Sequence, residues 1–174
     1  PRHMARPGGY FESMTRPLAP YACRGVIWYQ GESNHRNATS YARLLSQMIH
    51  AWRSDFGWDF PFYYVQIAPH AYGAENNTPA LLREQQQIVL AQVDNTAMIN
   101  ISDLVDDVND IHPRNKRAIG ERLASLAMDR NYGHFTQAYE SPVVSSVEYE
   151  KGKIVIHFQG NFSKLQWEDS VIEG

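Results

Sequence analysis

The stretch RGVIWYQGESN, residues 24–34, indicates the architecture of this chain. Its first part, Arg24 to Gln30, is rich in β-branched and aromatic side chains and lies between Pro20 and Gly31, which predicts a short buried strand. Apolar and polar residues do not alternate in this run, so both faces of the strand are expected to be covered. A strand of this kind is typical of a parallel sheet.

On the C-terminal side of this strand, predicted helices and strands alternate. Between Thr39 and Trp52 apolar residues recur at spacings of three and four, which predicts a helix with one apolar stripe. Further strands are expected over residues 60–68 and 95–101, a second helix from about Pro79, and a third helix that ends near Arg130. This alternation predicts an α/β domain over residues 1–138, with a parallel sheet covered on both faces.

Residues 139–174 follow a different pattern. Two β-type runs, Val143 to Tyr149 and Lys153 to Phe158, flank a turn at Lys151-Gly152, which predicts a hairpin. With about 35 residues, this β-rich segment is too short to bury a core of its own. It is therefore expected to be either a hairpin docked on the α/β part or the start of a second module.

The composition excludes several classes of function. A hydrophobic fraction of 43% is typical of a folded globular protein, and the net charge of -3 comes from signs interspersed along the chain, so neither nucleic acid nor a membrane is expected as a partner. The single cysteine, Cys23, excludes an internal disulfide. Histidines and acids lack the spacings of metal sites, so no metal and no cofactor are expected.

Two polar segments stand where an α/β sheet places its chemistry: WYQGESN at residues 28–34, after the first strand, and NDIHPRNK at residues 109–116, before the last helix. In an extended segment, residues two apart point to the same side. The Asp110 carboxylate is therefore expected to reach the ring of His112 and to orient it as a general base. A single histidine near a carboxylate is more often structural, so this pair alone is a weak signal.

The first segment also has two interpretations. It can be a plain strand-to-helix turn, with glycine for the bend and serine or asparagine for capping. Alternatively, Gly31 offers an open backbone N–H, and Gln30 or Asn34 offers a side-chain amide, to an oxyanion that develops during acyl transfer.

Taken together, the two segments resemble the sialate O-acetylesterase branch of the SGNH hydrolases, in which a GVIWYQGESN stretch precedes an NDIHP-N-K stretch. RPLAPYACRGVIWYQGESN, DFPFYYVQIAP and LLREQQ extend the resemblance over roughly residues 11–158. It implies a partial SGNH or flavodoxin-like three-layer sandwich and a serine esterase that removes acetyl groups from sugars, either sialic acid or an acetylated polysaccharide. An extracellular, periplasmic or lysosomal location follows by family association.

The resemblance also implies roles for individual residues. His112 looks like the general base, and Gly31, Gln30 and Asn34 look like the oxyanion and substrate-binding residues. The sequence departs from the common pattern, because many relatives carry the acid three residues before the histidine, where this chain has Asn109. Which carboxylate orients His112 therefore stays open between Asp110 and Glu32.

The serine nucleophile of the family has no counterpart before the first strand, where no Gly-Asp-Ser or Gly-Gln-Ser stretch occurs. Ser33 is a poor substitute, because His35 replaces the second glycine of a nucleophile elbow. The chain is accordingly expected to be the C-terminal part of an esterase domain, to depend on an N-terminal half, and to be inactive by itself. The alternative is a non-catalytic carbohydrate-binding or interaction module, with stacking surfaces from Trp28, Tyr29, Tyr63 and Tyr64.

Overall fold

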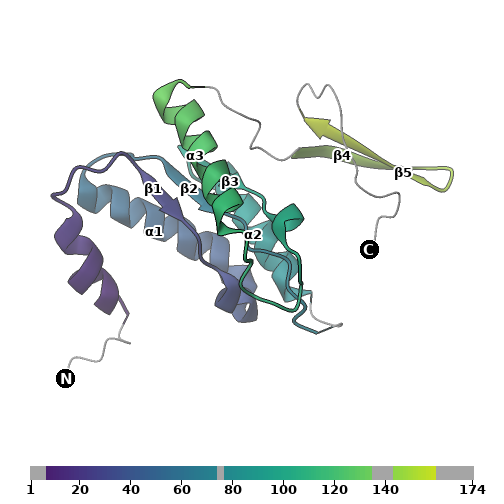
Figure 1. The fold of residues 1–174 in the computed structure, drawn as a ribbon, viewed down its shortest axis with the longest axis horizontal. Helices are drawn as coiled ribbons and strands as arrows, with labels where there is room; N and C mark the ends of the chain where they lie inside the picture. Colours follow the sequence, from purple (N-terminus) through teal and green to yellow (C-terminus); the bar gives the residue numbers. More distant parts are fainter. Residues whose placement is uncertain (1–6, 74–76, 135–142, 160–174) are drawn as a thin grey trace. The chain divides into compact units, whose positions relative to one another are not determined.

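The structure, a computed structural model, describes residues 7–73, 77–134 and 143–159. The chain divides into two compact units, Pro1–Glu140 and Ser141–Gly174. The first unit contains the α/β elements, and the second contains a hairpin (Figure 1). None of the helices in the described ranges is long and apolar enough to cross a membrane.

A three-stranded parallel sheet forms the centre of the first unit. Its strands are β1 (Val26–Trp28), β2 (Phe62–Val65) and β3 (Thr96–Ile99), in the order β1-β2-β3. Each pair is parallel, with Ile27 beside Tyr63 and Tyr63 beside Ala97. The predicted parallel sheet and its three strands are therefore confirmed, each strand being shorter than the apolar run that predicts it. The predicted burial of the first strand was wrong at Ile27, which is 65% exposed, because within the described residues β1 is an edge strand that pairs with β2 alone.

Helices cover both faces of this sheet (Figure 1). On one face, α1 (Tyr41–Phe56) and α2 (Thr78–Gln92) pack on Phe62 and Tyr64 of β2. On the other, α3 (Lys116–Tyr132) packs on Tyr63 and Val65, since successive side chains of a strand point to opposite faces. The predicted three-layer α/β architecture is confirmed. Shorter segments are a π-helical turn over Phe11–Thr15 and 3₁₀ segments over Arg16–Leu18, Glu32–Ser40 and Ser102–Leu104.

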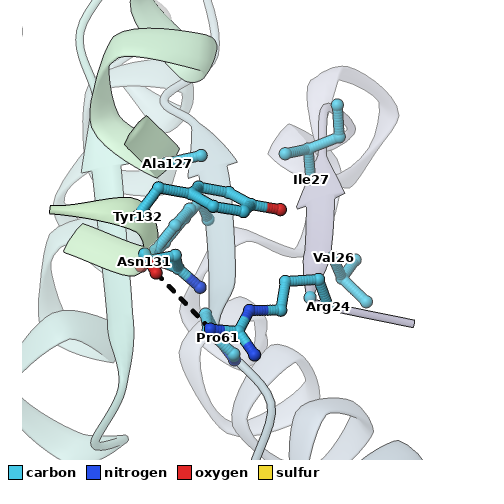
Figure 2. A pocket seen from close by; sticks show the side chains of 9 residues that line it. Arg24, Val26, Ile27, Pro61, Ala127, Asn131 and Tyr132 are labelled. Atoms are coloured by element: carbon cyan, nitrogen blue, oxygen red, sulfur yellow. Dashed lines mark hydrogen bonds between the residues drawn. The ribbon is translucent and has the colours of Figure 1, made fainter. Parts of the chain in front are cut away.

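At the amino-terminal ends of β1 and β2 lies a cavity of about 160 Å³ (Figure 2). Arg24 crosses it toward the end of α3, where its Nη2 donates to the backbone oxygen of Asn131 at 3.5 Å and its guanidinium lies 5.8 Å from the centre of the Tyr132 ring. Ile27 is 65% exposed on the same side of the sheet. Within the described residues β1 pairs with β2 alone, so its other edge faces outward.

The second unit, taken by itself, is an antiparallel hairpin of β4 (Val143–Glu150) and β5 (Lys153–Gln159). Lys151 and Gly152 both have positive φ, of 44° and 80°, as a two-residue hairpin turn requires. The predicted hairpin and its turn are confirmed. Whether residues 139–174 begin a second module or form a docked hairpin stays a prediction.

Candidate active site

Two segments meet at the carboxyl ends of the strands. The QGESN loop, Gln30–Asn34, follows β1, and the His112 segment, Asn109–Lys116, lies between β3 and α3. Because β1, β2 and β3 are parallel, both segments lie at the same edge of the sheet. Tyr29, the residue before the loop, contacts the His112 segment, since the Nζ atom of Lys116 lies 4.9 Å from the centre of its ring. The structure therefore brings the two predicted segments together.

Gly31 occupies a place that only glycine fits. Its φ is +150°, which L side chains rarely adopt, and a Cβ atom there would lie 2.9 Å from Cγ2 of Ile67 and 3.3 Å from the hydroxyl of Tyr41. The residue is buried, and its carbonyl accepts from the backbone N–H of Asn34 at 2.7 Å. Within the described ranges, no hydrogen bond is made by the Gly31 N–H. This N–H is thus a fixed donor held in an enclosed position.

The two amide side chains of the QGESN loop are paired with each other. Nε2 of Gln30 donates to Oδ1 of Asn34 at 2.7 Å, and the hydroxyl of Tyr41 donates to the backbone oxygen of Gln30 at 3.0 Å. With its oxygen engaged, Asn34 keeps its Nδ2 group as a donor, for which the described part of the chain provides no acceptor. Gln30 thus holds the side-chain oxygen of Asn34, which leaves the Asn34 Nδ2 group to donate elsewhere.

Glu32 lies among tyrosines from several elements. The hydroxyl of Tyr72 donates to its backbone oxygen at 3.3 Å. Burial raises the pKa of Tyr29 to about 12, and the negative charge of Glu32 adds to this shift. Burial and then the same charge also raise the pKa of Tyr72. Burial is the main reason that the pKa of Tyr41 is raised, and Glu32 makes a smaller contribution in the same direction. The negative charge of Glu32 thus disfavours the ionised forms of Tyr29, Tyr41 and Tyr72.

The carboxylate of Asp110 binds the backbone around His112. Its Oδ1 accepts from the backbone N–H of His112 at 2.9 Å and lies 3.9 Å from Nδ1 of the His112 ring, while its Oδ2 accepts from Nε of Arg114 at 3.4 Å. The hydrogen bond from the His112 N–H, and then Arg114, lower the pKa of Asp110 against the opposing effect of burial. The His112 side chain is 85% exposed. The ring and the carboxylate are thus neighbours, separated by more than a hydrogen bond.

Asn109 has a local role. Its backbone N–H and its Nδ2 group both bind Oδ1 of Asp107, at 2.8 and 3.0 Å. This turn holds the loop that leads to Asp110. Asn109, at the position where many relatives of the resembled family have an acid, therefore binds an acid and contributes no carboxylate of its own.

Residues outside the two polar segments support the QGESN loop from behind, and no motif in the sequence singles them out. Gln86 of α2 is completely buried, and its Oε1 accepts from the backbone N–H of Ile67 at 2.9 Å. Tyr72 stacks on His35, with ring centres 4.1 Å apart. The signal for Gln86 is present in the sequence, because a glutamine interrupts the apolar stripe that Leu82 and Val89 define on α2.

Comparison with known proteins points to one family. A family model described as "Carbohydrate esterase, sialic acid-specific acetylesterase" matches residues 8–129. Among curated proteins, the sialate O-acetylesterase of Mus musculus is 28% identical over 158 residues, and that of Homo sapiens is 28% identical over 156 residues. Each match covers 79% of this chain, and 29% or 30% of the relative. The chain thus spans less than a third of the length of these curated relatives.

A solved structure shares the fold. The crystal structure of a carbohydrate acetylesterase from Xanthomonas citri matches with a TM-score of 0.77 and 38% sequence identity. The match covers 86% of this chain and 35% of that chain.

Proposed function

Because this chain belongs to the carbohydrate esterase family of sialic acid-specific acetylesterases, we propose that it carries the base and the oxyanion donors of a serine esterase that removes acetyl groups from sugar hydroxyls. One observation supports this most directly. The buried Gly31, with its N–H unused among the described residues, lies in a loop that contacts the segment of His112 through Tyr29 and Lys116. A base and a fixed donor at one sheet edge are what acyl transfer needs.

The chemistry assigned to these residues has two halves. A serine oxygen attacks the acetyl carbonyl carbon while His112 accepts the serine proton, and the carbonyl oxygen becomes an oxyanion bound by the Gly31 N–H and Asn34 Nδ2. The ester bond to the sugar then breaks, and His112 returns its proton to the departing sugar oxygen. Water attacks the acetyl-serine in the same way, which releases acetate and restores the serine.

Asp110 is proposed as the acid that orients His112. Its Oδ1 is already 3.9 Å from Nδ1 of the ring, and a small rotation of an exposed side chain closes such a gap when substrate binds. Glu32 remains the second candidate, because it belongs to the QGESN loop at the same edge of the sheet.

The nucleophile is proposed to come from polypeptide outside these 174 residues. The hydroxyls of Ser13 and Ser40 donate to backbone oxygens of their own helical turns, at 2.8 and 3.0 Å, and the hydroxyl of Ser46 is buried within α1. Ser33 is exposed on the QGESN loop. In the described ranges, no serine hydroxyl is hydrogen-bonded to His112. The outward edge of β1 and the exposed Ile27 also suit a dependence on an N-terminal half.

The substrate is proposed to be an O-acetylated sugar. The family description and the curated relatives name sialic acid or sialate, and the Xanthomonas citri protein is named a carbohydrate acetylesterase. Sialic acid is therefore the first substrate to assay, and an acetylated polysaccharide is the second.

The rival function, a non-catalytic carbohydrate-binding module, loses its main support. Tyr63 and Tyr64 are 4% and 0% exposed, so they are core residues and offer no stacking surface. Trp28 packs edge-on against Trp52 with ring centres 5.8 Å apart. The expectation that these side chains stack on sugars was wrong for Tyr63 and Tyr64, because the strand that bears them is covered on both faces.

The decisive experiment measures acetate release from O-acetylated sialic acid by the full-length gene product, read from its upstream start codon, and by the 174-residue chain. The full-length protein is expected to release acetate and His112→Ala to abolish it. The 174-residue chain is expected to match a heat-treated control on an aryl acetate. Activity of the full-length protein that survives His112→Ala would contradict the proposal. Activity of the short chain that disappears with Ser33→Ala would make Ser33 the nucleophile.

A further inference from the structure

The ammonium group of Lys116 joins the two halves of the site. Its Nζ lies 4.9 Å from the centre of the Tyr29 ring, within the range in which a cation is attracted to an aromatic face. Tyr29 directly precedes the QGESN loop. Lys116 is the first residue of α3 and follows His112 by four positions. The contact therefore links the loop that offers the oxyanion donors to the segment that bears the base.

Helix α3 does not account for a lysine at this position. A positive charge in the first turn opposes the helix dipole, and the first turn of α3 contains no acidic residue. The helix is already capped, since the side chain of Asn115 accepts from the N–H of Ala118 at 3.2 Å. Among the residues that the structure describes, no carboxylate lies within ion-pair distance of Lys116. The Tyr29 ring is the partner that explains the lysine.

The ring of Tyr29 matters here more than its hydroxyl. The side chain packs against the apolar cluster under α3, and its hydroxyl is buried with no hydrogen-bond partner in the described part of the chain. This phenol, whose pKa is raised to about 12 mainly by burial, is neutral at physiological pH. The hydroxyl thus neither carries charge nor anchors the loop, and the aromatic face is left as the functional part.

We propose that Lys116 and Tyr29 form a clasp that fixes the distance between His112 and the Gly31 N–H, which makes both of them positioning residues. The proposal rests on the esterase function proposed above. His112 itself is 85% exposed, and the carboxylate beside it, that of Asp110, belongs to its own segment. Across the described part of the chain, no hydrogen bond or ion pair joins residues 109–115 to the QGESN loop. A misplacement of about 1 Å at a reacting group can cost about 10²-fold in rate.

The clasp is tested first without reference to catalysis, by amide hydrogen exchange of residues 109–115 in the full-length gene product. Lys116→Met and Tyr29→Leu are each expected to speed exchange in this segment about tenfold, whereas Lys116→Arg and Tyr29→Phe keep the cation or the ring and stay near wild type. Arg117→Met is the matched control, since Arg117 pairs with Glu121 on the same helix. Unchanged exchange in Lys116→Met would overturn the clasp.

The positioning role is then tested by the kinetics of acetate release. Lys116→Met is expected to lower kcat by about 10- to 100-fold with little change in KM, and the double variant with Tyr29→Leu is expected to lose no more than the worse single variant. Rescue by Lys116→Arg supports positioning. Additive losses, or a change confined to KM, would overturn it. A wild-type protein that releases no acetate would refute the esterase function, while hydrogen exchange still decides the clasp.

Discussion

The side chain of Gln86, completely buried in α2, accepts a hydrogen bond from the backbone N–H of Ile67 at 2.9 Å. Its Nε2 group donates to the backbone oxygen of Val65 at 3.3 Å. One glutamine side chain thus provides hydrogen-bond partners for a backbone N–H and a backbone carbonyl at the end of β2, where the chain leaves the sheet. It also lies behind Gly31, whose missing Cβ would be 3.5 Å from the same Nε2.

We predict that Gln86→Leu lowers the free energy of unfolding by about 3 kcal/mol, because it leaves a buried N–H and a buried carbonyl without partners. Urea denaturation measures the change. Gln87→Leu is the control, since Gln87 is exposed on the same helix and its replacement is expected to change stability by less than about 0.5 kcal/mol. Equal effects of the two substitutions would contradict the role given to Gln86.

Gly31→Ala is predicted to destabilise the fold by about 2 to 4 kcal/mol, the sum of an unfavourable φ and a steric clash. Gly57→Ala separates the two causes. Gly57 also has positive φ, +75°, as the residue that ends α1, but a methyl group there would meet no atom within 4 Å. It is expected to cost only about 1 kcal/mol. If both variants unfold at the same urea concentration, the contacts with Ile67 and Tyr41 do not restrict this position.

The acid that orients His112 can be identified in the full-length gene product with three single substitutions: Asp110→Asn, Asn109→Ala and Glu32→Gln. We expect Asp110→Asn to lower the turnover of acetate release most, by up to about 10⁴-fold, since an orienting acid fixes the tautomer of the base. His112→Ala provides the fully disabled reference. Near-normal turnover of Asp110→Asn, together with a loss of several orders of magnitude in Glu32→Gln, would assign the role to Glu32.

Acid is predicted to weaken the contact between α3 and the loop after β3. Arg122 donates to Asp103 and to the backbone oxygen of Asn100, and its hydrogen bond is the main reason that the pKa of Asp103 is lowered. The unfolded chain therefore binds this proton more readily than the folded one. The stabilisation is present above the unfolded pKa of about 3.9 and is lost as the pH falls through the lower folded value.

The measurement is the Tm of wild type and Asp103→Asn between pH 6 and pH 2.5. The variant is expected to have a lower Tm at pH 6 and a shallower decline on acidification. The effect is modest, because the Asp103 side chain is 63% exposed. Asp106→Asn, at an exposed acid with no ion pair in the described residues, serves as the control. Parallel curves for wild type and Asp103→Asn would show that the ion pair does not contribute.

The order of strands and helices could be predicted from the sequence because it depends on local patterns. The run from Val26 to Trp28 is apolar on both sides, and the spacing of Ile119, Leu123 and Leu126 indicates which face of α3 is buried. The Lys151-Gly152 turn follows from residues that tolerate positive φ. Long-range pairing was not needed for any of these predictions. The predicted burial was wrong at Leu44, in the apolar stripe of α1, and at Ile27 of β1, since both side chains are exposed.

The candidate site was predictable only in part. Its residue types and their places after strands follow from the sequence, and so does the spacing of Asp110 and His112. The spacing does not determine what the carboxylate binds: in the folded loop Asp110 takes the backbone N–H of His112 and the side chain of Arg114, which lie closer than the ring.

What the sequence by itself determined is therefore the parallel α/β arrangement and the family of the chain, because helix and strand periodicity and contiguous motifs are local properties. Only the tertiary structure decided that Lys116 meets Tyr29 and that Gln86 lies behind Gly31. Each of these relationships joins parts of the chain that are far apart in sequence. They form when the parallel strands align their carboxyl ends and the helices cover both faces, and no local pattern of residues encodes them.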